Sequence, residues 1–284
     1  MLPTAAARNH RRQAAITAAV VVGARRLWRR MRPTGNWGDQ YRANVGPATT
    51  ALVLAGQKAV AAESEGYMAA VLAELDIPAE SPTSLNLPGF VGVAGDGRPV
   101  DTLLEQTVVH AGETYNRTQD APAALDDAQA FLDRYVATIM ADTARAAESA
   151  AMVQRPWVEG WVRMLVPPGD CSRCIVLAGK FYLWNDGFER HPLCNCKHIP
   201  AQEEGERFGS LLTNPNDYFD SLTADEQDRI FTKAGAEAIR DGADISQVVN
   251  ARRGMSTSQH GRIKRVAVYG QQVYITDEGT TRRG

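Results

Sequence analysis

All four cysteines of this chain lie in one short window, and none occurs elsewhere. The cysteines and the histidines beside them are Cys171, Cys174, His191, Cys194, Cys196 and His198. Two cysteines separated by two residues, followed by a His/Cys group, can surround a tetrahedral metal ion. Such an ion would hold together two segments that are distant in sequence. The window therefore limits the possible folds more than any other part of the chain.

Zinc is the metal that this donor set favours. The first two cysteines are the natural first pair of ligands, because a C-x2-C turn easily brings two sulfurs within about 4 Å. His191 and Cys194 have the same spacing and form the easier second pair. Cys194 and Cys196 in an extended strand would stand roughly 6–7 Å apart, so Cys196 is a substitute ligand and His198 a weaker one. Four protein ligands leave no open coordination position, so we predict a structural site.

Other roles for the cysteine window remain open. The thiols could be small buried residues, or they could pair as disulfides outside the cell. A catalytic cysteine would need a base, which His191 or His198 could supply. The window also loosely resembles the zinc pairs of His-Asn-His nucleases, but Asn195 lies inside the cysteine pair, and the expected downstream Asn and second His are absent at a usable spacing. The sequence contains no phosphate-binding loop and no G-x-S-x-G or H-E-x-x-H motif.

The N-terminal region is strongly basic. Residues 1–42 hold nine arginines and one acid, whereas the rest of the chain has 22 basic and 32 acidic residues, a balance of −10. Helical spacing of the apolar residues in 8–32 predicts a basic amphipathic arm over residues 1–35. Such an arm suits nucleic acid, an acidic protein surface or anionic lipid, or it is simply a solvated helix face. The candidate contact residues are Arg8, Arg11, Arg12, Arg25, Arg26, Arg29, Arg30 and Arg32.

An apolar run at residues 14–24 could be mistaken for a signal peptide. It is shorter than the about 20 residues that a bilayer span requires. Four arginines follow it within six residues, where a cleaved export signal would have small residues. We therefore expect no membrane contact and a cytoplasmic location.

The remaining pattern predicts an α+β fold. Residues 36–155 read as a helical domain, with helices over 47–75, 101–118 and 122–150 and a Pro/Gly-rich loop over 77–100. Residues 156–284 form a second unit with strand candidates at 162–166 and 180–184 and a Cys/His cluster at 171–198 that binds the metal. A capping box from Thr223 to Glu226 predicts a helix that ends at Gly242. A C-terminal hairpin is expected from strands 265–269 and 272–275, joined through Gly270.

Several motifs of this second unit resemble those of MuF-like phage head morphogenesis proteins. The family's core motif is similar to Cys171-x2-Cys174-x2-Leu177-x-Gly179, followed by His191-Pro-x-Cys194-x-Cys196 and Pro200. Segments 231–244, 248–254 and 278–284 resemble the C-terminal part of minor capsid proteins of actinobacterial tailed phages. The resemblance covers roughly residues 155–284, and the helical first half only in general character.

The resemblance implies a minor virion protein inside the head, associated with the portal and incorporated into the procapsid during assembly. Its expected roles are in head morphogenesis and in DNA packaging or ejection, without a chemical reaction or a small-molecule substrate. The arm would contact packaged DNA or an acidic face of the portal or scaffold. The alternatives are a small zinc-containing nuclease, a non-specific nucleic-acid-binding protein, or a regulatory DNA-binding module.

Overall fold

The structure of the chain is a computed structural model. It describes residues 2–166, 171–183, 196–203, 205 and 208–251, and the backbone of three further strands at 264–268, 271–276 and 279–281. The described chain is mainly helical, with a small antiparallel sheet after the long helices. The α+β expectation is confirmed at this level. The proposed division at residue 155 falls between the last long helix and the first strand.

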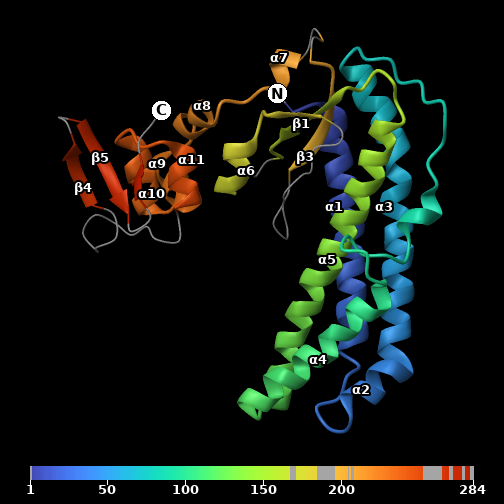
Figure 1. The fold of residues 1–284 in the computed structure, drawn as a ribbon. Coiled ribbons are helices and arrows are strands. Elements are labelled where there is room, and N and C mark those ends of the chain that lie inside the picture. The colour runs from blue at the N-terminus through green and yellow to red at the C-terminus, as the bar shows by residue number, and fades with distance from the viewer. Residues whose placement is uncertain are drawn as a thin grey trace.

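Three long helices form an elongated bundle (Figure 1). They are α1 (Thr4–Trp28), α3 (Gly46–Glu74) and α5 (Ala121–Val153), and α4 (Val100–Thr118) packs against α3 and α5 in the lower half of the view. The N-terminus of α1 meets the C-terminus of α3, because the backbone N–H groups of Thr4 and Ala5 donate to the Glu74 carboxylate at 2.6 and 2.9 Å. A carboxylate at that position also complements the positive end of the α1 dipole.

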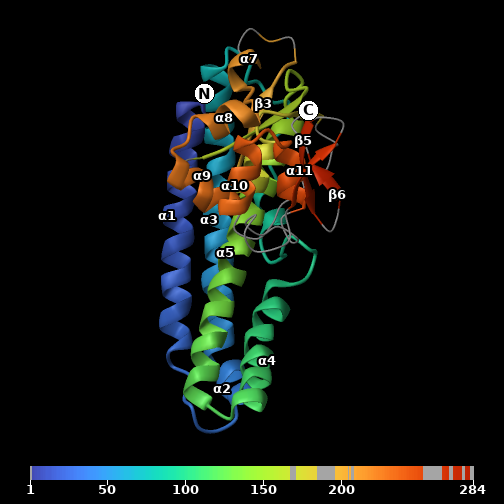
Figure 2. The ribbon, with the colours of Figure 1, turned by 90° about the vertical axis from the view of Figure 1, so that its left-hand side faces the viewer.

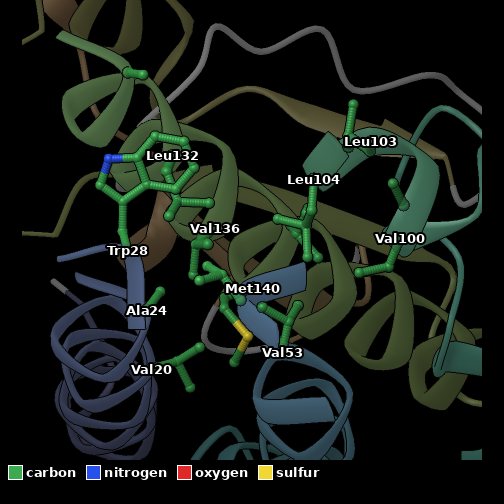
Figure 3. Close-up of a cluster of buried hydrophobic side chains, with 14 of the residues drawn as sticks. Val20, Ala24, Trp28, Val53, Val100, Leu103, Leu104, Leu132, Val136 and Met140 are labelled. Carbon is green, nitrogen blue, oxygen red and sulfur yellow. The ribbon is translucent and has the colours of Figure 1, made fainter. Parts of the chain in front are cut away.

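Apolar residues at helical spacing build the bundle core (Figure 3). Val20, Ala24 and Trp28 of α1 pack with Val53 of α3 and Met140 of α5. The indole N–H of Trp28 also donates to a backbone carbonyl of α5 at 2.9 Å. The basic segment that we expected as a separate arm is therefore an integral bundle helix, because its apolar stripe is buried against α3 and α5.

The connections between the long helices are short or irregular. After α1 come α2 (Trp37–Gln40) and one π-helical turn (Tyr41–Val45) that leads directly into α3. The Pro/Gly-rich segment has a 3₁₀ turn (Leu87–Phe90) and one bridge between Val93 and Pro99. The predicted helices over 101–118 and 122–150 correspond to α4 and α5, and the Asp120 side chain accepts from an N–H of the first turn of α5.

The sheet lies at the end of the bundle where α1 begins (Figures 1 and 2). Its central strand is β1 (Gly160–Met164), which pairs antiparallel with β2 (Phe181–Leu183) and β3 (Lys197–Ala201) in the order β2-β1-β3. The first two strands lie at the predicted candidates. The sequence did not suggest β3, which directly follows the last cysteine. Buried Val162 and Ile199 of the sheet pack with Tyr67 and Met68 of α3.

Short helices beside the upper bundle have a core of their own (Figure 2). They are α6 (Ser172–Leu177), α8 (Pro215–Asp220), α9 (Ala224–Phe231), α10 (Lys233–Arg240) and α11 (Ile245–Asn250), whereas α7 (Phe208–Leu211) packs with the sheet and the upper bundle. That core is built around Ile175 of α6 and Phe219 of α8. The capping box at the start of α9 is confirmed. The single helix to Gly242 is wrong, because Thr232 has a φ of +67° and separates α9 from α10.

The C-terminal strands form an antiparallel sheet in the order β4-β5-β6. They are β4 (Lys264–Val268), β5 (Gln271–Thr276) and β6 (Gly279–Thr281). The predicted hairpin is confirmed by the pairing of β4 with β5, and β6 adds a third strand that the sequence did not suggest. The predicted turn residue Gly270 lies outside the described residues.

Candidate functional site

The structure brings three of the five predicted metal ligands together. Cys174 and Cys196 pack against each other and are each 2% exposed, and Cys171 and Leu165 pack against them. The segment that contains Cys171 and Cys174 and the segment that begins at Cys196 are separated by about twenty residues of sequence. The other two predicted ligands, His191 and Cys194, lie outside the described residues.

Strand β1 positions both halves of this cysteine cluster. Cys171 is the N-cap of α6, and its carbonyl accepts from the Ile175 N–H at 3.0 Å, so the C-x2-C segment forms a helical turn. The chain after α6 returns to β1, where Gly179 N–H donates to the Arg163 carbonyl at 2.7 Å. Cys196 immediately precedes β3, which pairs with the other edge of β1. The cluster thus lies where α6, β1 and β3 meet.

A buried arginine contacts the cysteine cluster. Arg163 of β1 is 2% exposed, and its Nη2 donates to the Cys174 Sγ at 3.5 Å. A buried cation at this position could offset part of the negative charge of thiolates if the cysteines bound a metal. Among the described residues, no group of three or more His, Cys, Asp and Glu side chains has the arrangement of a metal site. Zinc binding therefore remains a prediction.

His198, the weakest of the candidate ligands, lies in β3 and is 5% exposed. Its ring packs at a tilt of 34° against Trp161 with 4.2 Å between centroids, and Trp161 in turn stacks on Tyr182 at 4.5 Å. Its backbone carbonyl accepts from the Tyr67 hydroxyl at 3.2 Å. The structure thus gives His198 a packing role between the sheet and α3.

A buried polar centre joins the sheet to the bundle, and the sequence did not reveal it. The ammonium of Lys197 in β3 forms an ion pair with Glu148 of α5, and the two side chains are 4% and 0% exposed. It also donates to Asn9 Oδ1 at 2.7 Å and to Gln13 Oε1 at 3.1 Å, both on α1. The Tyr67 ring lies 4.9 Å away, so all three long helices contact this one lysine. The only sequence signal was a lysine inside the cysteine window.

Burial affects the protonation of this region. It lowers the pKa of Lys197, and the neighbouring Glu148 carboxylate opposes that shift. His10 of α1 lies nearby, half-buried, and its pKa is lowered from the ordinary value of 6.5, first by burial and then by the positive charges of Lys197 and Arg145. The polar centre therefore favours the neutral form of His10, and the charge of the nearby Lys197 is balanced by Glu148.

The eight predicted arginine contacts are all exposed. Five lie on α1, Arg29 is its C-cap, and Arg30 and Arg32 lie just beyond its end. Arg12 pairs with Glu63 of α3 at 3.2 Å, and Arg25 pairs with Asp133 of α5 at 2.7 Å. Within the described part of the chain, five other arginines on α1 or at its end form no ion pair; they are Arg8, Arg11, Arg26, Arg29 and Arg30. The outward side of α1 therefore has a clear excess of positive charge.

No known protein family, no curated protein and no solved structure matches this chain. The resemblance drawn from the Cys/His motif thus stays a prediction. Among the described helices, none combines the length and the apolar character that crossing a membrane requires.

Proposed function

We propose that this protein is a minor head protein of a tailed phage, associated with the portal inside the procapsid. It supports head assembly and DNA packaging or ejection through contacts with other proteins and with DNA, and it performs no chemical reaction. It assembles in the host cytoplasm and remains in the interior of the head. The proposal rests on the MuF-like motifs of residues 155–284.

The observation that carries the proposal is the way in which the motif packs. Its C-x2-C element and its last cysteine, Cys196, lie together where α6, β1 and β3 meet. This packing supports the interpretation that the motif residues stabilise the fold, as expected for the sequence motif of a structural protein. The arginines on the outward side of α1 then offer a contact surface for packaged DNA or for an acidic partner.

Zinc is the group that we propose for the cysteine cluster. Cys171, Cys174 and Cys196 supply thiolate donors, and His191 and Cys194 are the candidates that complete the set. When bound, the metal would link α6 to the start of β3, and Arg163 would offset part of the negative charge of its thiolates. Elemental analysis of the purified protein tests this: we expect about one zinc per chain, and less than about a tenth would overturn the proposal.

Mass spectrometry of purified virions tests the proposed function. We expect this chain in intact particles, at low abundance relative to the major capsid protein, with chemical crosslinks to the portal. Empty procapsids should also contain it, because incorporation precedes packaging. A chain that is expressed during infection but absent from both particles would contradict the proposal.

The arginine side of α1 favours one second candidate, a protein that binds nucleic acid without sequence preference. Phosphate contacts are strongly weakened by salt, so a gel shift at two salt concentrations distinguishes this binding from protein docking. A plasmid-nicking assay with and without divalent metal tests the zinc nuclease alternative. Nicking that depends on the cysteines would replace the head-protein proposal with an enzymatic function.

A further inference from the structure

An open groove of about 410 Å³ runs between α1 and α5. Its middle is lined by small and apolar side chains, which include Ala14, Ala18 and Val21 of α1 and Ala137, Met140 and Ala141 of α5. The lining extends along α1 from His10 to Val21, which corresponds to about three helical turns. We call this hollow the α1–α5 groove.

The surface of α1 beside the groove is also apolar. Between Arg12 and Arg25 the helix carries no charged residue. Ala15 and Ala19 are exposed there, and Val22 is 42% exposed. At a rise of about 1.5 Å per residue, this uncharged stretch is about 20 Å long. A water-exposed apolar stretch of this kind, next to a hollow, marks a contact surface.

Positive charge lies at both ends of the uncharged stretch. Arg11 lies at one end, next to His10 of the groove lining, whereas Arg12 beside it pairs with Glu63 of α3. Arg25, Arg26 and Arg29 lie at the other end. The acids nearby are already compensated: Asp133 pairs with Arg25, Asp142 with Arg145, and Glu148 with Lys197. These pairs also use Arg25, Arg145 and Lys197, so the positive charge left for a partner, among the described residues, is that of Arg11, Arg26 and Arg29.

We propose that the α1–α5 groove binds an amphipathic helix of a protein partner that has acidic residues at both ends. Small side chains let a third helix approach closely, and the partner's apolar face would cover the alanines and Val22. Its acidic residues would stand about 15 to 18 positions apart, to match Arg11 at one end and Arg26 and Arg29 at the other. If the proposed function is correct, a portal or procapsid protein supplies this helix.

The same features make two other occupants less suitable. A nucleic-acid backbone has no apolar surface to place on the uncharged stretch, although the arginines alone would attract it. A second copy of this chain would bring its own arginine groups against those of the first, and like charges at close range oppose association. An acidic amphipathic helix complements both parts of the surface: its apolar face covers the uncharged stretch, and its acidic residues pair with the arginines.

Fluorescence anisotropy with the full-length protein tests the proposal. The probe is a labelled synthetic helix of about 18 residues with Leu and Ala on one face and Glu pairs at both ends. The comparison probes are the same peptide with Lys pairs, a peptide whose apolar face is replaced by Gln and Ser, and a DNA duplex. The variant Ala18→Asp places a charge in the groove, and Ala69→Asp on the exposed side of α3 is its matched control.

We expect the acidic peptide to bind at least about tenfold more tightly than the Lys peptide or the polar peptide. Ala18→Asp should weaken that binding by about tenfold or more, whereas Ala69→Asp should change it less than about twofold. Equal binding of the acidic and Lys peptides, or no binding of either up to about 1 mM, overturns the proposal. Binding of DNA alone, unaffected by Ala18→Asp, would assign the surface to nucleic acid. The chain would remain a virion component in either case, so failure here is distinct from failure of the proposed function.

Discussion

The side chain of Lys197 reaches from the sheet into the helical bundle and ends among groups from α1, α3 and α5. A buried charge is stable only where a partner and hydrogen bonds replace the lost water. Glu148, Asn9 and Gln13 supply these contacts. At the scale of single residues, this centre fixes the position of the sheet on the bundle.

Removing one partner of this ion pair should be costly. We expect Lys197→Met to lower the free energy of unfolding by about 3–5 kcal/mol, because Glu148 would be left buried without its cation. Adding Glu148→Leu should recover part of the loss, since no uncompensated charge remains. Chemical denaturation of the single and double variants measures both effects.

The matched control is Arg98→Met, which removes an exposed ion pair with Asp96. It should change the free energy of unfolding by less than about 1 kcal/mol. If the changes in the free energy of unfolding caused by Lys197→Met and Glu148→Leu simply add in the double variant, the two side chains do not act as a pair.

His10 should make stability depend on mildly acidic pH. Its pKa is lowered in the folded protein, so between that value and the ordinary value of 6.5 the unfolded chain binds more protons than the folded chain. The free energy of unfolding should therefore fall as the pH drops through this range. Urea denaturation at several pH values should show a smaller fall for His10→Gln than for the unsubstituted protein. Identical pH profiles would contradict the lowered pKa.

At the scale of helices, the bundle depends on close approach between α1, α3 and α5. A β-carbon added to Gly56 of α3 would lie 2.7 Å from Val20 Cγ2 and 2.9 Å from Met140 Sδ. A β-carbon at Gly66, nearly three turns further along the helix, would meet nothing within 4 Å. Two glycines in one helix therefore have different roles, and only the first is required by packing.

Substitutions at these two glycines should have opposite effects. Gly56→Val should lower the free energy of unfolding by about 1–3 kcal/mol, because the core there is already filled. Gly66→Ala should raise it by about 0.5–1 kcal/mol, because alanine favours the helix and has room. Thermal unfolding followed by circular dichroism compares the two. Destabilisation by Gly66→Ala would contradict the open environment at that position.

The break between α9 and α10 depends on the backbone conformation of Thr232. Thr232 has φ +67° and ψ 153°, a region that favours glycine, while its hydroxyl accepts from the Gly235 N–H at 3.2 Å. We expect Thr232→Gly to raise the free energy of unfolding by about 1 kcal/mol, because the relieved backbone strain exceeds the small difference between Thr and Gly as N-caps. Thr232→Ala keeps the strain and loses the cap, so it should be destabilising. The opposite order of the two variants would contradict this explanation.

At the scale of the whole molecule, two apolar cores are separate. The bundle core is built from the long helices, whereas the core of α6 and α8–α11 contains Ile175 and Phe219. The cysteine cluster and β1 lie between these two parts. A metal at the cluster would therefore stabilise the junction and the C-terminal helices more than the bundle.

Limited proteolysis tests this division of stability. A zinc chelator should make the chain after residue 166 sensitive to trypsin, while a fragment that contains α1, α3, α4 and α5 should persist and remain helical. Returning zinc, but not magnesium, should restore protection, since thiolates favour zinc. Digestion that is unchanged by the chelator would show that no metal stabilises the junction.

Local signals in the sequence were sufficient for the long helices, the first two strands, the capping box and the C-terminal hairpin. Each depends on periodicity, capping residues or turn residues that lie close together in the chain. β3 was missed because its five residues follow the cysteines directly and include Pro200, which is unfavourable inside a strand. The break at Thr232 was missed because a threonine at positive φ is rare and carries no sequence signal.

The sequence by itself determined the helical character of the first half and the grouping of the cysteines, because both depend on residue types at short spacing. Only the tertiary structure decided that the basic N-terminal segment belongs to the bundle, since an amphipathic helix can bury its apolar stripe against its own chain or against a partner. Tertiary structure also decided that Lys197 meets Glu148, 49 positions away, because a buried ion pair depends on three-dimensional proximity. The same packing left the α1–α5 groove open between two arginine groups.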